Sequence, residues 1–209
     1  MLRKIVATLV NLRETVTGSY GPGTFSYVKF IYISFFSLNT FKIFSLDLEA
    51  YAKGGGSETD DFSLHAATIE QLRSFRQGKK LPREFYYDEI HDLSVCHVAA
   101  RGTDIAYIHW LYYPGRKSRF FHLEKGVVEV NNCLTMPSYR GRNLMARVCG
   151  FTALTLKGSE ARHLLMVIHK DNVASIKSAQ RAGFRELREI RSLGPFNGKV
   201  RTSSLVPDA

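Results

Sequence analysis

Apolar and polar residues follow each other in short runs along the chain, and these runs predict alternating strands and helices. Residues 2–16 place apolar side chains at the spacing of an amphipathic helix. Two runs rich in aromatic and β-branched residues, 25–36 and 41–48, predict strands. The polar segment 54–61 (GGGSETDD) reads as a flexible linker. The pattern therefore divides the chain into an N-terminal extension, 1–53, and a main domain, 62–209.

In the main domain, strand-like and helix-like runs alternate. Two predicted strands, 95–100 and 105–113, flank the turn RGTD, and this arrangement predicts a hairpin. Such alternation favours an α/β fold, in which helices flank a mixed sheet. Further strands are predicted at 62–67, 126–135, 164–169 and from 184 onward, and helices at 68–77, 143–157 and 173–182.

Composition narrows the class of protein. A hydrophobic content of 44% is ordinary for a globular chain, and the net charge of +10 favours anionic ligands or surfaces. The three cysteines, Cys96, Cys133 and Cys149, lie in apolar contexts and are odd in number. They are typical of buried free thiols in a reducing compartment, so we expect a cytoplasmic protein and no metal site.

The N-terminal region lacks the features of a secretion signal or a membrane span. The apolar stretch within residues 1–12 is short, and no small-residue cleavage site follows it. The run 27–36 is about half the length that spans a bilayer, and Lys29 interrupts it. Contact of residues 1–38 with a membrane surface stays open, because this region is aromatic and basic.

The segment TMPSYRGRNLMARV, which begins at Thr135, carries the strongest chemical signal. It places Arg140, Gly141 and Arg142 in a turn between an apolar strand and a helix. Such a turn directs backbone N–H groups and the positive end of the helix toward one point, as phosphate binding requires. A second helix-start signal, at Asn172, follows the next apolar strand.

The order of these motifs resembles the GCN5-related N-acetyltransferase (GNAT) superfamily over about two-thirds of the chain. The match rests on the Arg-Gly-Arg turn, Pro137, Asn172, Ser175 and the Gly183-Phe184 pair. The resemblance implies a mixed, mostly antiparallel central sheet flanked by helices, as in acyl-CoA N-acyltransferases. Three positions depart from the family pattern: Asn143 and Met145 replace loop glycines or alanine, and Ala179 replaces a tyrosine that acts as general acid.

The resemblance also implies a site for acetyl-CoA as acyl donor. The N–H groups of residues 141–146 would surround the pyrophosphate, and strand end 133–135 would pair with the pantetheine arm. For Asn172, ligand contact and a plain N-cap are both open. The implied cofactor residues are Cys133, Leu134, Thr135, Arg140, Gly141, Arg142, Asn143, Leu144, Met145, Ala146, Asn172 and Ser175.

Glu129 is the candidate general base, because an acceptor amine must lose a proton before it attacks. Strand alternation is expected to put it on one face with Asn131, Cys133 and Thr135. It precedes Arg140 by eleven residues, a spacing at which histone-type members carry a catalytic glutamate. The alternative is an edge or solvent-facing glutamate on an amphipathic strand. Other members place a base on the following strand, at a position where this chain has Val167. His169, on the same face of that predicted strand, is the candidate substitute in this chain.

Two main functions follow from this reading. The first is an acetyl-CoA-dependent N-acetyltransferase that acts on a primary amine, with residues 81–92 and 112–121 shaping the acceptor site. The alternative is a non-catalytic module that binds acyl-CoA or a partner. A homodimer stays open. A nucleic-acid binder is disfavoured, because only the net charge supports it and no recognition motif is present.

Overall fold

The structure is a computed structural model that describes residues 23–28, 32, 38–51, 61–116, 118, 120 and 122–193. It divides into two compact units: residues 41–190 with 202–209, and residues 1–40 with 191–201. In the smaller unit, residues 24–28 are helical. The predicted strand at 25–36 is therefore wrong where it can be checked, because a short apolar run fits a helix as well as a strand. The predicted helix at 2–16 and most of the linker at 54–61 lie outside the described residues.

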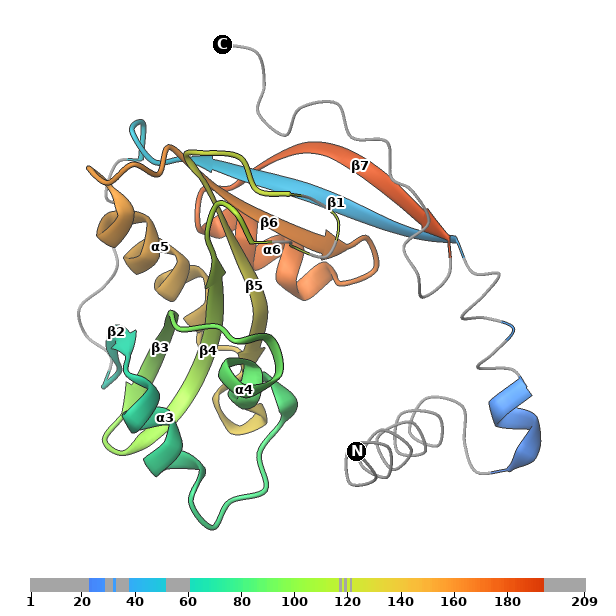
Figure 1. The fold of residues 1–209 in the computed structure, drawn as a ribbon, viewed down its shortest axis with the longest axis vertical. Coiled ribbons are helices and arrows are strands. Elements are labelled where there is room, and N and C mark those ends of the chain that lie inside the picture. The colour runs from blue at the N-terminus through green and yellow to red at the C-terminus, as the bar shows by residue number, and fades with distance from the viewer. Residues whose placement is uncertain are drawn as a thin grey trace. The chain divides into compact units, whose positions relative to one another are not determined.

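The larger unit is built on a mixed sheet of seven strands in the order β2-β3-β4-β5-β6-β1-β7 (Figure 1). Strands β2 to β5 are successively antiparallel, and β5 and β6 are parallel. The expected mixed, mostly antiparallel sheet is confirmed. The strands are β1 (Leu38–Asp47), β2 (Ser63–Ala67), β3 (Cys96–Arg101), β4 (Asp104–Tyr112), β5 (Val127–Thr135), β6 (His163–His169) and β7 (Arg185–Leu193).

Strand β1 lies inside this sheet, between β6 and β7. It pairs antiparallel with β6 from Phe41 opposite His169 to Asp47 opposite His163, and Phe44 in its middle is fully buried. The predicted division at 54–61 therefore does not separate β1 from the main domain. A polar linker marks where the chain leaves a strand, but it says nothing about where that strand pairs.

Helices cover both faces of the sheet (Figure 1). On one face lie α3 (Ile69–Arg76), the 3₁₀ turn η1 (Arg83–Tyr86) and α4 (Tyr87–His91). On the other lie α5 (Leu144–Leu156) and α6 (Val173–Arg181), whose inner residues share a core with the sheet. Thr68, the first residue of the helix predicted at 68–77, caps α3, and a reciprocal bond with Gln71 completes a capping box. Neither η1 nor α4 was predicted, because such short helices leave no clear period in the sequence.

A β-bulge interrupts the pairing of β4 with β5. Glu129 lies opposite Tyr112 and Thr135 lies opposite Tyr107, so six steps along β5 match five along β4. Asn132, in the irregular stretch, has a left-handed backbone with φ of 54°. The bulge moves the side chains beyond it to the other face of the strand. Glu129 and Thr135 therefore lie on opposite faces, and the expectation that they share one face is wrong.

Candidate active site

The parallel strands β5 and β6 diverge before either one ends. They pair from Val127 opposite His163 to Glu129 opposite Leu165. Beyond that point β5 continues to Thr135 and β6 to His169 without pairing with each other. The β6-facing edge of residues 130–135 thus resembles a free sheet edge, to which an extended ligand can add.

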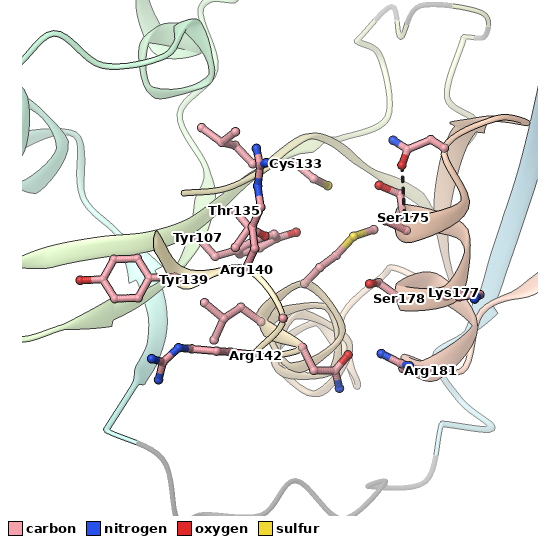
Figure 2. A pocket seen from close by; sticks show the side chains of 17 residues that line it. Tyr107, Cys133, Thr135, Tyr139, Arg140, Arg142, Ser175, Lys177, Ser178 and Arg181 are labelled. Carbon is pink, nitrogen blue, oxygen red and sulfur yellow. Dashed lines mark hydrogen bonds between the residues drawn. The ribbon is translucent and has the colours of Figure 1, made fainter. Parts of the chain in front are cut away.

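A cavity of about 490 Å³ lies on the α5 and α6 side of this divergence (Figure 2). The end of β5, the turn before α5 and the inner side of α6 line it. The structure brings together every residue implied as a cofactor contact except Ala146, which is buried in the first turn of α5 and does not line the cavity. Glu129 does not line it either.

The turn before α5 leaves backbone donors available. Gly141 has φ of 82°, and Asn143 adopts φ of 56° and ψ of 24°, which is left-handed backbone that asparagine tolerates better than most residues. The Asn143 side chain makes no capping hydrogen bond. N–H groups in the first turn of a helix have no partner within the helix, so they can bind an anion at this end of the cavity.

Four cationic side chains line the cavity: Arg140 and Arg142 from the turn, and Lys177 and Arg181 from α6. No aspartate or glutamate lines it. Among the described residues, none of the four forms an ion pair, and Arg142 lies over the Phe62 ring at 5.8 Å. Figure 2 shows Arg181 reaching from α6 toward the cavity. The cavity therefore has a positive potential that favours polyanionic ligands.

Helix α6 provides the second wall. Its N-cap is Asn172, whose Oδ1 accepts a hydrogen bond from the Ser175 N–H at 3.2 Å, and both residues also line the cavity. Ser178 and Arg181 line it as well and were missed by the sequence analysis. Their spacing of three residues from Ser175 to Ser178 to Arg181 marks one helix face, and this periodicity was the signal that could have found them.

The departures from the family pattern have different consequences. Met145 lines the cavity and is only 8% exposed, so it narrows the cavity from the α5 side. Ala179 is fully buried in the α5-side core and does not line the cavity. His169, proposed as a substitute base, packs edge-on against Phe41 with ring centroids 5.1 Å apart.

Glu129 lies on the face of β5 that η1 and α4 cover, and it is 1% exposed. Its Oε1 accepts a hydrogen bond from Asn131 Nδ2 at 2.9 Å, whereas its Oε2 is buried without a partner among the described residues. Burial raises the pKa of Glu129 to about 7, and the Ser118 hydroxyl opposes the rise. A carboxyl with this pKa exchanges protons near neutral pH, as a general base must.

A buried polar network lies between the sheet and α5. The Thr152 hydroxyl donates to the Val148 carbonyl at 2.8 Å, so its oxygen accepts from His97 Nδ1 at 2.7 Å and from His109 Nε2 at 3.0 Å. His109 Nδ1 then accepts from the Tyr107 hydroxyl at 3.0 Å. This pattern requires the His109 ring to be neutral, because its Nε2 donates while its Nδ1 accepts. It also fixes Tyr107 on the cavity wall.

We expect this network to make the fold sensitive to acid. Burial lowers the pKa of His97 to about 4 and that of His109 well below its ordinary value. Both rings gain a proton on unfolding below pH ~6.5, so each lowers the unfolding free energy by up to about 1.4 kcal/mol per pH unit as pH falls from there toward 4. The raised pKa of Glu129 acts in the opposite direction between pH ~4.5 and 7.

Urea unfolding at several pH values tests this expectation. His97→Asn is the informative variant, because an amide Nδ2 can donate to Thr152 in place of Nδ1 but does not titrate. As pH falls from 6.5 to 4, the unfolding free energy of the variant should decrease less than that of wild type. Equal losses in the two proteins would show that His97 is not held neutral by the fold.

The described residues contain no metal-binding cluster and no membrane-spanning helix. No group of three or more histidine, cysteine, aspartate or glutamate residues there is placed to hold a metal ion. Within the same part of the chain, no helix is both long and apolar enough to cross a membrane.

No family model and no curated protein matches this sequence, whereas solved structures do. A GCN5-related N-acetyltransferase-like protein from Streptococcus suis aligns with a TM-score of 0.52 and 11% identity, over 79% of this chain and 66% of its own. A GNAT-family acetyltransferase from Colwellia psychrerythraea aligns with a TM-score of 0.51 and 12% identity, over 79% of this chain and 60% of its own. A GCN5-related N-acetyltransferase from Kribbella flavida aligns with a TM-score of 0.51 and 11% identity, over 83% of this chain and 64% of its own. This chain therefore spans less than two-thirds of each, and it has the fold of the GCN5-related N-acetyltransferases.

Proposed function

We propose that the protein is an acetyl-CoA-dependent N-acetyltransferase that acts on a primary amine. One observation carries the proposal: a cavity lined by four cations and no acidic residue lies where β5 and β6 diverge, at the start of α5. Acetyl-CoA has a pyrophosphate and a separate 3′-phosphate, followed by an extended arm. The cationic side chains complement the negative charge of the phosphates. The unpaired edge of β5 offers backbone groups with which the extended arm can form hydrogen bonds.

In this proposal the N–H groups of residues 141–146 hold the pyrophosphate, assisted by Arg140 and Arg142. The backbone of residues 133–135 pairs with the pantetheine arm, in the manner of an added strand. Asn172 and Ser175 contact the arm from α6. Support comes from the left-handed turn at Gly141 and Asn143, which leaves the first turn of α5 without a capping side chain.

The bound thioester supplies an activated acetyl group, and the protein must supply a deprotonated amine. Glu129 is the proposed base, because its pKa of about 7 leaves much of it ionised at neutral pH. An alkylamine with a pKa near ~10 is mostly charged there, so proton removal limits its reactivity. A thiol with a pKa near ~8.5 leaves readily as thiolate. The buried Ala179 is therefore compatible with turnover.

The bulge in β5 places the proposed base and the proposed donor cavity on different faces of the strand. We therefore propose that the amine approaches from the face covered by η1 and α4, while the donor lies on the α5 and α6 face. The thioester would meet the amine at the divergence of β5 and β6. Residues 83–91, within the predicted acceptor region 81–92, form η1 and α4 on that face.

Arg181→Ala should weaken acetyl-CoA binding about five- to tenfold, because it removes a cation that no carboxylate pairs with among the described residues. The dependence of affinity on salt should also decrease. Calorimetric titration at two salt concentrations measures both effects. Lys170→Ala is the matched control, since Lys170 is exposed and does not line the cavity. Equal affinities for Arg181→Ala and Lys170→Ala would remove Arg181 from the binding site.

The second candidate function is a non-catalytic acyl-CoA-binding module. The burial of Ala179 outside the cavity and the narrowing by Met145 favour it. One experiment separates the two functions: acetyl-CoA is incubated with a panel of polyamines, amino sugars, aralkylamines and peptides, and thiol release is followed. Amine-dependent release supports the transferase. Tight binding without release by any amine supports the module.

A further inference from the structure

A chain of hydrogen bonds connects Glu129 to the bulge in β5. The Asn132 N–H donates to Asn131 Oδ1 at 2.8 Å, and Asn131 Nδ2 donates to Glu129 Oε1 at 2.9 Å. An N–H group can only donate, so the first bond fixes which end of the Asn131 amide points at the carboxylate. The left-handed backbone of Asn132, φ 54°, lies in the same irregular stretch.

This arrangement treats the two carboxylate oxygens differently. Oε1 is held by Asn131, whereas Oε2 is buried and has no partner among the described residues. A general base needs one oxygen with a free lone pair and a fixed direction. A buried polar atom without a hydrogen-bond partner destabilises the fold, so binding of a ligand or a proton at Oε2 would remove that unfavourable energy.

The surroundings of Glu129 explain why Asn131 matters for its ionisation. From β4 the neighbour is Tyr112, from β6 Leu165, and from the loop before β5 Ser118. Burial raises the pKa of Glu129, and the Ser118 hydroxyl opposes that rise, whereas no cationic side chain among the described residues does so. A hydrogen bond donated to a carboxylate stabilises the charged form, so we expect the Asn131 bond to act in the same direction as the Ser118 hydroxyl.

We propose that Asn131 is a positioning residue, which holds Glu129 Oε1 so that Oε2 is the atom that accepts the proton of the amine. This inference rests on the proposed function, in which Glu129 is the base. The bulge then has a second role besides moving side chains between faces. The Asn132 N–H in the bulge orients the Asn131 amide, and the Asn131 amide orients the Glu129 carboxylate.

The matched pair of variants is Asn131→Leu and Asn132→Gly. Leucine has a similar size but cannot donate, so the Glu129 pKa should rise by about one unit. Glycine removes the Asn132 side chain and its bond to the Tyr112 hydroxyl at 3.0 Å. It keeps the N–H and tolerates the left-handed backbone, so the pKa should stay at the wild-type value. Asn131→Ala repeats the test if the leucine variant does not fold.

Two readouts are needed. Carbon-13 NMR of the glutamate carboxyls, with Glu129→Gln to identify the resonance, gives the Glu129 pKa without any substrate. The pH dependence of kcat/KM gives the pKa that governs catalysis. We expect both to rise in Asn131→Leu, so that the rate near pH 6 falls about tenfold and recovers above pH ~8.

The outcomes separate the inference from the proposed function. Parallel shifts in both readouts, absent in Asn132→Gly, support the inference. An unchanged carboxyl pKa in folded Asn131→Leu and Asn131→Ala overturns it, whether or not the protein is an enzyme. A shifted carboxyl pKa with an unshifted pH profile, or without any turnover in wild type, overturns the base role of Glu129 and, with it, the positioning role in catalysis.

Discussion

Glu129→Gln should lower kcat about a hundredfold near neutral pH, since it removes the proposed base and keeps the shape of the side chain. The loss should shrink as pH approaches the pKa of the amine, near ~10, because free amine then no longer needs a base. In wild type, the rate should rise with pH through about 7, where the Glu129 carboxyl ionises. Steady-state kinetics from pH 6 to 10 with saturating acetyl-CoA measures all three effects.

The control for this variant is Glu124→Gln, which makes the same chemical change at an exposed position just before β5. It should match wild type at every pH. Acetyl-CoA affinity should be unchanged in both variants, because Glu129 does not line the donor cavity. A Glu129→Gln variant with wild-type kcat throughout the pH range would remove Glu129 from the mechanism.

Gly141→Asp should weaken acetyl-CoA binding by well over tenfold, which corresponds to at least about 1.4 kcal/mol. The new carboxylate would lie in the turn where N–H groups and arginines are proposed to hold the pyrophosphate. A Cβ atom at this position meets no atom within 4 Å, so the expected effect is electrostatic and not a clash of the Cβ. Calorimetric titration measures the change.

Gly141→Asn separates charge from backbone strain. Position 141 has φ of 82°, which disfavours any side chain, and asparagine tolerates this region about as well as aspartate does. The asparagine variant should therefore bind within a few-fold of wild type. Equal weakening in the two variants would point to strain alone, and unchanged binding in folded Gly141→Asp would contradict the pyrophosphate assignment.

Local signals in the sequence predicted much of the main unit. Thr68 and Asn172 were expected at helix starts, and both act as N-caps, because capping depends on a side chain and the next three residues only. The turn between β5 and α5 was predicted for the same reason, and Asn143, which replaces a loop glycine of the family pattern, adopts a left-handed backbone there. These features depend on short stretches of chain, so single-sequence reasoning reaches them.

The features that were missed depend on contacts between distant segments. The bulge at Asn132 has no glycine to mark it, and it reversed the expected face of Glu129 relative to Thr135. Similarly, nothing in the β1 sequence shows that it pairs with β6. The network around Thr152 joins β3, β4 and α5, and its histidines looked unrelated in the sequence.

Amide hydrogen exchange of the wild-type protein, with and without acetyl-CoA, tests most directly whether the divergence of β5 and β6 is the donor site. Binding of the pyrophosphate and the pantetheine arm should slow exchange at residues 141–146 and 133–135, with smaller effects at the start of α6. The account predicts protection concentrated in these segments at saturating acetyl-CoA. Unchanged exchange there, or protection confined to other parts of the chain, would contradict it.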